Sequence, residues 1–202
     1  MPRPRKVSDA ALMDAAADAL GRKGPRFTMA DVAELAGVAT ATVAMRFGSK
    51  QALLLAMTAV AKDDLLTRMR AAADAETDPV RSIAAAALAA LAGGGDPSAT
   101  ANHLSQLGAD LVDPDLRASL ARLRDDYREE LRVLLEKVPL PNAPSAAQAA
   151  RILAGLVHGL QLDWALAPDG DMLTTIGSDV DTLLAWWSGA SADYCRPDAE
   201  GD

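Results

Sequence analysis

The sequence predicts an all-α protein, and its composition carries that prediction. Half of the 202 residues are apolar and only 3% are aromatic. Alanine and leucine dominate, β-branched runs are almost absent, and both leading residues rank among the strongest helix formers. A chain of this length and apolar content buries a substantial core in one or two domains, so a disordered protein is excluded.

Charge is distributed unevenly along the chain. The net charge is −8, but residues 1–62 hold nine cations against five anions, whereas residues 63–202 hold 11 cations against 23 anions. Such asymmetry predicts a small basic module that can approach phosphate, joined to a larger acidic module that stays away from it. Chance clustering of charge is the alternative explanation.

Targeting and redox signals point to the cytoplasm. The longest apolar run is well short of the roughly 18 residues of a membrane span, and no apolar region follows the basic residues at the N-terminus. Cys195 is the single cysteine, which excludes an internal disulfide and agrees with a reducing compartment. We therefore expect a cytoplasmic protein with no membrane partner.

The first helix is predicted to lie between an N-cap and a pair of glycines. Ser8 is a favourable N-cap, and Gly21 and Gly24 end the helix before Pro25 forbids its continuation. One face of this helix is apolar at helical spacing and is expected to be buried: Leu12, Ala15, Ala16, Ala19 and Leu20.

Residues 28–47 are predicted to form a helix-turn-helix unit. Thr28 and Asp31 have the spacing of a capping box at the start of a short helix, and Gly37 provides a left-handed turn position after it. A second helix then covers residues 39–47, which completes the spacing of the unit. Two short helices of an ordinary bundle, without a DNA-binding role, are the alternative.

The second helix of this unit has an outward face of small residues. With about 100° between successive residues, Val43, Phe47 and Ala39 share the side that faces the preceding helices. Small side chains on the other side would let the helix sit deep in a major groove, where a hydroxyl can bond a base edge and apolar groups can touch thymine methyls. These outward residues are Ala41, Thr42, Ala44 and Met45.

Cations flank this outward face. Arg46 lies where a phosphate would run, Ser49 is expected to cap the next helix, and Lys50 in its first turn can pair with phosphate. The N-terminus adds a basic arm that could reach an adjacent groove, with a disordered solubilising tail as the alternative. The predicted DNA-binding residues are Arg3, Arg5, Lys6, Thr28, Thr40, Ala41, Thr42, Ala44, Met45, Arg46 and Lys50.

Several residues of the first 60 together match one known family pattern: Phe27 and Thr28, "DVAELAGV" at 31–38, Thr42, Phe47 and "SKQALL" at 49–54. In these residues the N-terminal part resembles the DNA-binding domain of the TetR family of bacterial transcriptional regulators. The resemblance covers roughly the first 60 residues and implies a homodimer. It further implies that the first three helices bind operator DNA, and that the C-terminal helices bind a small ligand and form the dimer interface.

The recognition helix departs from the pattern of that family. Ala44 and Met45 stand where the family usually has a tyrosine and a histidine that often contact phosphate, so the resemblance implies fewer phosphate contacts here. The expected organisation is an N-terminal basic arm and three-helix helix-turn-helix DNA-binding domain over residues 1–50. A C-terminal helical bundle for ligand binding and dimerisation is expected over residues 51–202.

The acidic part is predicted to be a bundle of amphipathic helices. One long helix covers residues 49–75, another begins at Pro79, and Asp113 with Pro114 starts a third whose apolar seam includes Tyr127. A buried phenol needs a hydrogen-bond partner, either on a neighbouring helix or in a pocket. The candidate contacts for a small, mostly apolar effector are His103, Gln106, Tyr127, His158, Gln161 and Trp164.

The last two predicted helices carry more apolar surface than one seam needs. They could pair with a symmetry copy in a four-helix interface, as the resemblance implies, or lie within the core of one monomer. The predicted dimer interface comprises Ile152, Leu153, Leu156, Leu160, Ile176, Val180, Leu183, Leu184 and Trp187.

Catalysis, a metal site and a cofactor are not expected. The two histidines and the cysteine are isolated, and no serine lies in a nucleophile motif. The sequence therefore predicts a ligand-responsive DNA-binding transcriptional regulator, a repressor that binds a palindromic operator as a homodimer. A helical small-molecule-binding protein whose helix-turn-helix no longer binds DNA specifically is the alternative.

Overall fold

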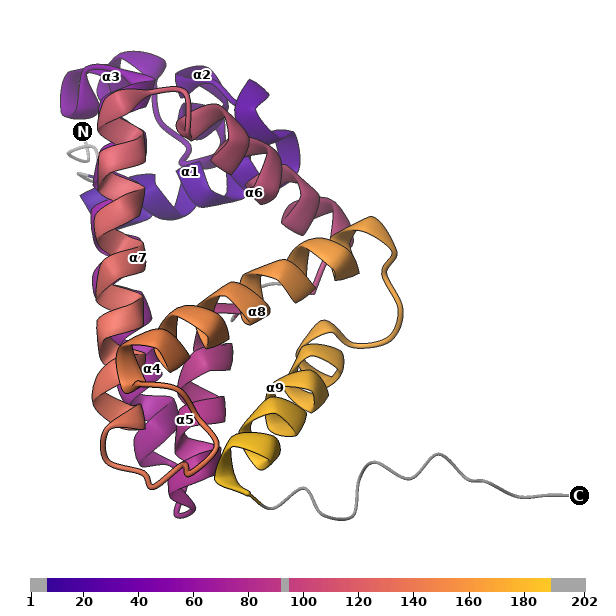
Figure 1. The fold of residues 1–202 in the computed structure, drawn as a ribbon. Coiled ribbons are helices and arrows are strands. Elements are labelled where there is room, and N and C mark those ends of the chain that lie inside the picture. The colour runs from indigo at the N-terminus through magenta and orange to yellow at the C-terminus, as the bar shows by residue number, and fades with distance from the viewer. Residues whose placement is uncertain (1–6, 92–94, 190–202) are drawn as a thin grey trace, which may run out of the picture. The chain divides into compact units, whose positions relative to one another are not determined.

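The described part of the chain is built of helices. The computed structural model describes residues 7–91 and 95–189, and no strand occurs within these ranges (Figure 1). This confirms the predicted all-α class. None of the described helices combines the length and the hydropathy needed to cross a membrane. Cys195 lies outside the described residues.

The helices form two compact units. Unit 1 contains residues 7–63 and 95–124, and the rest of the described chain belongs to unit 2. Unit 1 is therefore assembled from two segments that are separate in the sequence. Two long helices, α4 (Lys50–Asp74) and α7 (Pro114–Leu135), each contribute residues to both units.

Unit 1 opens with three helices and one turn of 3-10 helix. These elements are α1 (Asp9–Lys23), η1 (Gly24–Arg26), α2 (Met29–Leu35) and α3 (Thr40–Phe47). The start of α4, helix α6 (Pro97–Asp110) and the start of α7 complete the unit. The predicted apolar face of α1 is buried, and it shares one core with Phe27, Val32, Val43, Leu53 and Leu116.

Local signals set the two ends of α1. Ser8 caps the helix, as predicted, by accepting a hydrogen bond from the backbone N–H of Ala11 at 3.1 Å. The helix does not stop at Gly21 but continues to Lys23. Gly24 ends it with a φ of 55°, in the left-handed region that favours glycine.

Helix α6 is fastened to the C-terminal end of α1. It packs against α1 and η1, and Asn102 Nδ2 donates a hydrogen bond to the carbonyl oxygen of Gly21 at 2.8 Å. A Cβ added at Gly24 would lie 2.8 Å from Asn102 Oδ1. A larger residue at Gly24 would therefore push Asn102 aside and also hold a strained backbone.

Unit 2 is a bundle that includes the second halves of α4 and α7. Its other elements are α5 (Pro79–Leu88), the 3-10 turn η2 (Ala89–Leu91), α8 (Ala146–Leu166) and α9 (Met172–Ser188). Helix α9 packs against both α5 and α8. Capping side chains start three of these helices, namely Asp78 for α5, Ser145 for α8 and Asp171 for α9.

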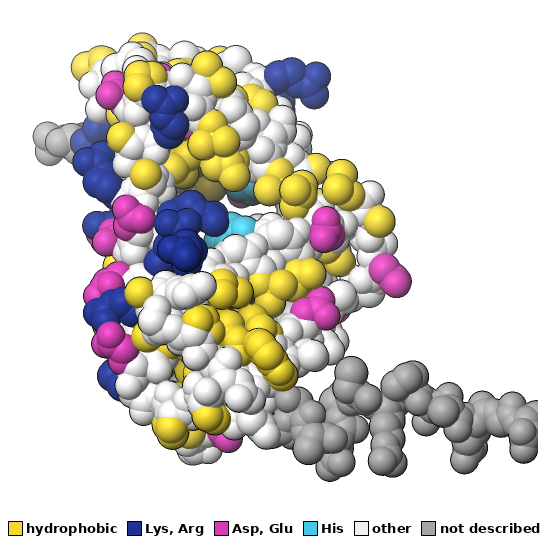
Figure 2. Space-filling model, viewed as in Figure 1, with side chains coloured by type: hydrophobic (Ala, Val, Ile, Leu, Met, Phe, Trp, Pro, Cys, Tyr) yellow, Lys and Arg dark blue, Asp and Glu magenta, His cyan; other side chains and the backbone are white. Residues whose placement is uncertain are grey.

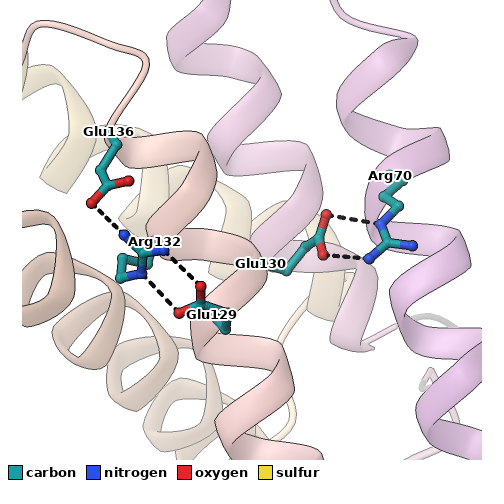
Figure 3. Close-up of polar contacts among 5 residues, drawn as sticks. All are labelled: Arg70, Glu129, Glu130, Arg132 and Glu136. Carbon is teal, nitrogen blue, oxygen red and sulfur yellow. Dashed lines mark hydrogen bonds and ion pairs between the residues drawn. The ribbon is translucent and has the colours of Figure 1, made fainter.

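Two arginines form ion pairs with acidic residues of α7 in unit 2. Arg70 on α4 makes a bidentate pair with Glu130 on α7, with nitrogen–oxygen distances of 3.0 and 2.8 Å (Figure 3). Arg132 pairs with Glu129 and Glu136 along α7 itself. The acidic residues on this face of α7 are thus the partners of arginines, as expected for solvated ion pairs.

Candidate nucleic-acid interface

A capping box and a glycine fix the unit formed by α2 and α3. The Thr28 hydroxyl accepts a hydrogen bond from the Asp31 N–H at 3.3 Å, and the Asp31 carboxylate accepts one from the Thr28 N–H at 2.8 Å. This confirms the predicted capping box. The Lys23 ammonium, 2.6 Å away, and then the Thr28 N–H lower the pKa of Asp31 to about 2. Gly37 takes the left-handed conformation predicted for the turn, with a φ of 65°.

Helix α3 buries one side and exposes the other. Val43 is fully buried in the core of unit 1, and Phe47 packs against that core while partly exposed. Ala39, expected on the inner side, is exposed because it is the extended N-cap residue and not part of the helix. The exposed side comprises Ala41, Thr42, Ala44, Met45 and Arg46, and Met45 is 89% exposed. The predicted outward residues are thus presented on the surface of unit 1.

The two predicted cations at the end of α3 and the start of α4 already have protein partners. Arg46 Nε lies 3.0 Å from Asp9 Oδ1 at the start of α1. Lys50 Nζ donates to the carbonyl oxygens of Pro25 and Phe27 at 2.7 and 2.8 Å, and lies 4.1 Å from the centre of the Phe27 ring. Burial lowers the pKa of Lys50. Lys50 therefore connects the start of α4 to the segment before α2, and its pairing with phosphate stays a prediction.

The other predicted DNA-binding residues are either exposed at helix starts in unit 1 or lie outside the described residues. Thr28 and Thr40, at the starts of α2 and α3, are exposed. Arg26, which is not among the predicted residues, is also exposed, in η1 two residues before the cap of α2. The basic arm lies outside the described residues: Arg3, Arg5 and Lys6.

The candidate effector contacts are divided between the two units. His103 and Gln106 lie on α6 in unit 1, and the other four lie in unit 2. His103 is exposed, with Nδ1 2.7 Å from the carbonyl oxygen of Ala99, and buried Gln106 donates to Asp110 Oδ1 at 2.5 Å. Both residues thus have partners within their own helix.

In unit 2, the buried phenol of Tyr127 bonds a neighbouring helix. Its hydroxyl donates to the carbonyl oxygen of Ala87 on α5 at 2.8 Å, which is the first of the two arrangements the sequence left open. The ring of His158 meets Tyr127 edge-on at 5.7 Å between centroids. Trp164 is buried, and its Nε1 has no hydrogen-bond partner among the described residues. Within the same ranges, no cluster of three or more His, Cys, Asp or Glu side chains could hold a metal ion.

Helices α8 and α9 carry an open, mostly apolar groove on the surface of unit 2. Figure 2 shows hydrophobic side chains gathered over these two helices. Trp186 is 55% exposed and Ile152 is 40% exposed. The groove is lined by Ile152, Leu156, Leu160, Asp179, Thr182, Leu183 and Trp186.

Five of the nine residues predicted for the dimer interface lie in the core of a single subunit. Those five residues are buried inside unit 2 itself, because α9 packs its inner stripe against α5 and α8. Trp186, which was not predicted, is exposed in place of Trp187. Neighbouring residues on a helix point about 100° apart, and the sequence does not fix which of two adjacent tryptophans faces outward. The buried residues are Leu153, Ile176, Val180, Leu184 and Trp187.

An exposed helix held by a capped partner helix and a glycine turn, in an all-α chain, defines a helix-turn-helix protein. Residues 12–57 match the family described as bacterial regulatory proteins, tetR family. This confirms the resemblance to the TetR family that the N-terminal sequence shows. A comparison with curated proteins finds no match.

Solved structures of transcriptional regulators share the fold along most of the chain. A transcriptional regulator from Rhodococcus sp. Rha1 is 22% identical with a TM-score of 0.72, covering 90% of this chain and 98% of that one. The TetR-family regulator PfmR from Thermus thermophilus is 22% identical with a TM-score of 0.61, covering 86% and 96%. The regulator FadR from Bacillus subtilis, in complex with stearoyl-CoA, is 14% identical with a TM-score of 0.66, covering 88% and 98%. The chain has the fold of TetR-family transcriptional regulators.

Proposed function

We propose that this protein is a homodimeric transcriptional repressor that binds a palindromic operator in the cytoplasm and leaves it when a small effector binds. The observation that carries the proposal is the exposed face of α3, which is held outward by the Thr28–Asp31 capping box and the Gly37 turn. The match of residues 12–57 to the tetR family and the shared fold support it.

The groove on α8 and α9 supports a homodimer. A mostly apolar surface that includes a half-exposed tryptophan loses water-exposed area when it meets its own symmetry copy. Two-fold symmetry then presents two α3 helices to successive major grooves, about 34 Å or somewhat more apart. The operator read by such a dimer is a palindrome.

The effector is proposed to be small, mostly apolar and bound by unit 2. Trp164 supports this assignment, because its buried Nε1 could donate to a hydrogen-bond acceptor on the effector. Tyr127, His158 and Gln161 are the other candidate contacts in this unit. The similar FadR was solved with stearoyl-CoA, a molecule with a long apolar chain. Helix α4 contributes residues to both units. We propose that it couples effector binding to DNA binding, with a coupling free energy of about 1–3 kcal/mol.

A second candidate function is a helical small-molecule-binding protein that does not read DNA. The engagement of Arg46 by Asp9 and of Lys50 by two carbonyl oxygens favours it, because both reduce the charge offered to phosphate. Ala44 and Met45 add no hydrogen-bond donor on the exposed side of α3. The two candidates differ in their response to DNA.

Selection of bound sequences from a random DNA pool tests the proposal. The full chain should enrich a palindrome, and titration of that sequence at several salt concentrations should give a steep loss of affinity with salt. Failure to enrich any sequence, together with an affinity for the unselected DNA pool that does not change with salt, would overturn the regulator and leave the second candidate. A single unrepeated site in place of a palindrome would overturn the dimeric arrangement.

A further inference from the structure

The exposed side of α3 is poor in groups that can recognise a base by paired hydrogen bonds. Recognition of guanine or adenine in the major groove usually needs the paired donors and acceptors of Arg, Lys, Asn or Gln. Helix α3 has the sequence TATVAMRF, in which Arg46 is the single residue of this kind. Arg46 is held at 3.0 Å by Asp9 and lies at the edge of the face.

What the face does offer is apolar contact. Met45 is 89% exposed, and the neighbouring side chains of Ala41 and Ala44 are single methyl groups. Thr42 adds one methyl and the one hydroxyl of the group. The short side chains also allow the helix backbone to approach the bases closely.

Thymine is the base whose major-groove edge fits such a face. It presents a C5 methyl and one acceptor, O4, whereas guanine presents two acceptors and cytosine presents an amino group without a methyl. An apolar surface placed against guanine or cytosine would leave those polar groups without water or partners, which is unfavourable. The Thr42 hydroxyl can serve the O4 of thymine or the adjacent base edge.

We propose that α3 reads thymine methyl groups, with Met45 and the Thr42 methyl as the residues that determine specificity. The inference rests on the proposed function, and it names the chemical feature of the operator that the protein recognises. It follows that each half-site contains at least one thymine whose methyl group contacts α3.

Deoxyuridine substitution tests this directly, because it removes the thymine methyl and leaves base pairing unchanged. Each thymine of the selected operator is replaced singly, and affinity for the full-length protein is measured by fluorescence anisotropy at one salt concentration. At a contacted thymine we expect affinity to fall about fourfold, the value for withdrawing about one CH₂ group from an apolar contact. Replacing the symmetry-related thymines of both half-sites should weaken binding about 15-fold. Thymines outside the half-sites should be insensitive.

Protein variants locate the effect on α3. In Met45→Ala and in Thr42→Ser the uracil penalty should vanish at the thymine that the replaced side chain contacts. Val112→Ala is the matched control, because Val112 is 82% exposed in unit 1 and lies outside α3, and it should retain every penalty.

The outcomes separate the inference from the proposed function. A selected palindrome that tolerates uracil at every position would overturn the inference and leave the regulator intact. Penalties that persist undiminished in both Met45→Ala and Thr42→Ser would also overturn it, because the methyl effect would not come from α3. The absence of any selected operator would instead remove the proposed function itself.

Discussion

Replacing either of the two adjacent tryptophans near the end of α9 with alanine should change a different property, dimer affinity in one case and folding stability in the other. Trp186 is 55% exposed in the apolar groove, whereas Trp187 is 1% exposed in the core of unit 2. We expect Trp186→Ala to weaken the homodimer while each subunit stays folded. Trp187→Ala should instead destabilise the fold by about 3–5 kcal/mol, the usual cost of emptying a large core site.

The size of the Trp186 effect follows from its exposed area. A tryptophan can bury about 200 Å², and its 55% exposure leaves about 110 Å² for the interface. At about 25 cal/mol per Å², and allowing for the methyl that alanine keeps, the loss is about 2 kcal/mol per subunit. Two-fold symmetry makes this about 4 kcal/mol per dimer, or about a thousandfold in the dimer dissociation constant.

Sedimentation velocity over a range of protein concentrations measures that constant, and circular dichroism verifies that each variant remains helical. The Trp187 variant serves as the internal comparison, because its main change should appear in the unfolding midpoint. A Trp186→Ala protein that dimerises as tightly as the parent would refute the assignment of the α8–α9 groove to the dimer.

Three further predictions concern hydrogen bonds and charge. Tyr127→Phe should lower the free energy of unfolding by about 1 kcal/mol through loss of the bond to the Ala87 carbonyl, which urea titration measures; an unchanged midpoint would contradict it. The pKa of Asp31 is about 2 in the folded state, against an ordinary value of 3.8. Its charged form therefore stabilises the fold fully above pH 3.8, and this stabilisation is lost as pH falls towards 2. Thermal melts at several pH values should show that Asp31→Asn abolishes this part of the acid dependence. Burial raises the pKa of Asp110, so ionising this carboxyl opposes folding: the cost appears as pH rises through 3.8 and is fully present above the raised folded-state pKa. Asp110→Asn should therefore raise Tm at pH 7, and a lower Tm would exclude this explanation.

The features that the sequence predicted correctly are those set by nearby residues. Ser8 and the Thr28–Asp31 pair act on backbone groups three residues away, so residue type and spacing were sufficient. The outward face of α3 followed in the same way from helical periodicity.

The features that it missed depend on contacts between distant segments. The carbonyl oxygens that hold Lys50 belong to residues 23 and 25 positions earlier, and no local pattern reveals that pairing. The choice between Trp186 and Trp187 depends on how α9 rotates against α5 and α8. Periodicity identifies an apolar helix, but a wide apolar surface leaves its rotation undetermined.

The composition of unit 1 has a consequence for exchanging parts between regulators. Its helix-turn-helix elements share a core with Leu116, and α1 is held by the hydrogen bond from Asn102; both residues come from the segment after residue 94. A chimera that transplants only the N-terminal residues would leave this surface uncovered and α1 without this hydrogen bond. A chimera that carries the DNA-binding module of this protein must therefore include both segments of unit 1, with junctions placed inside α4 and α7.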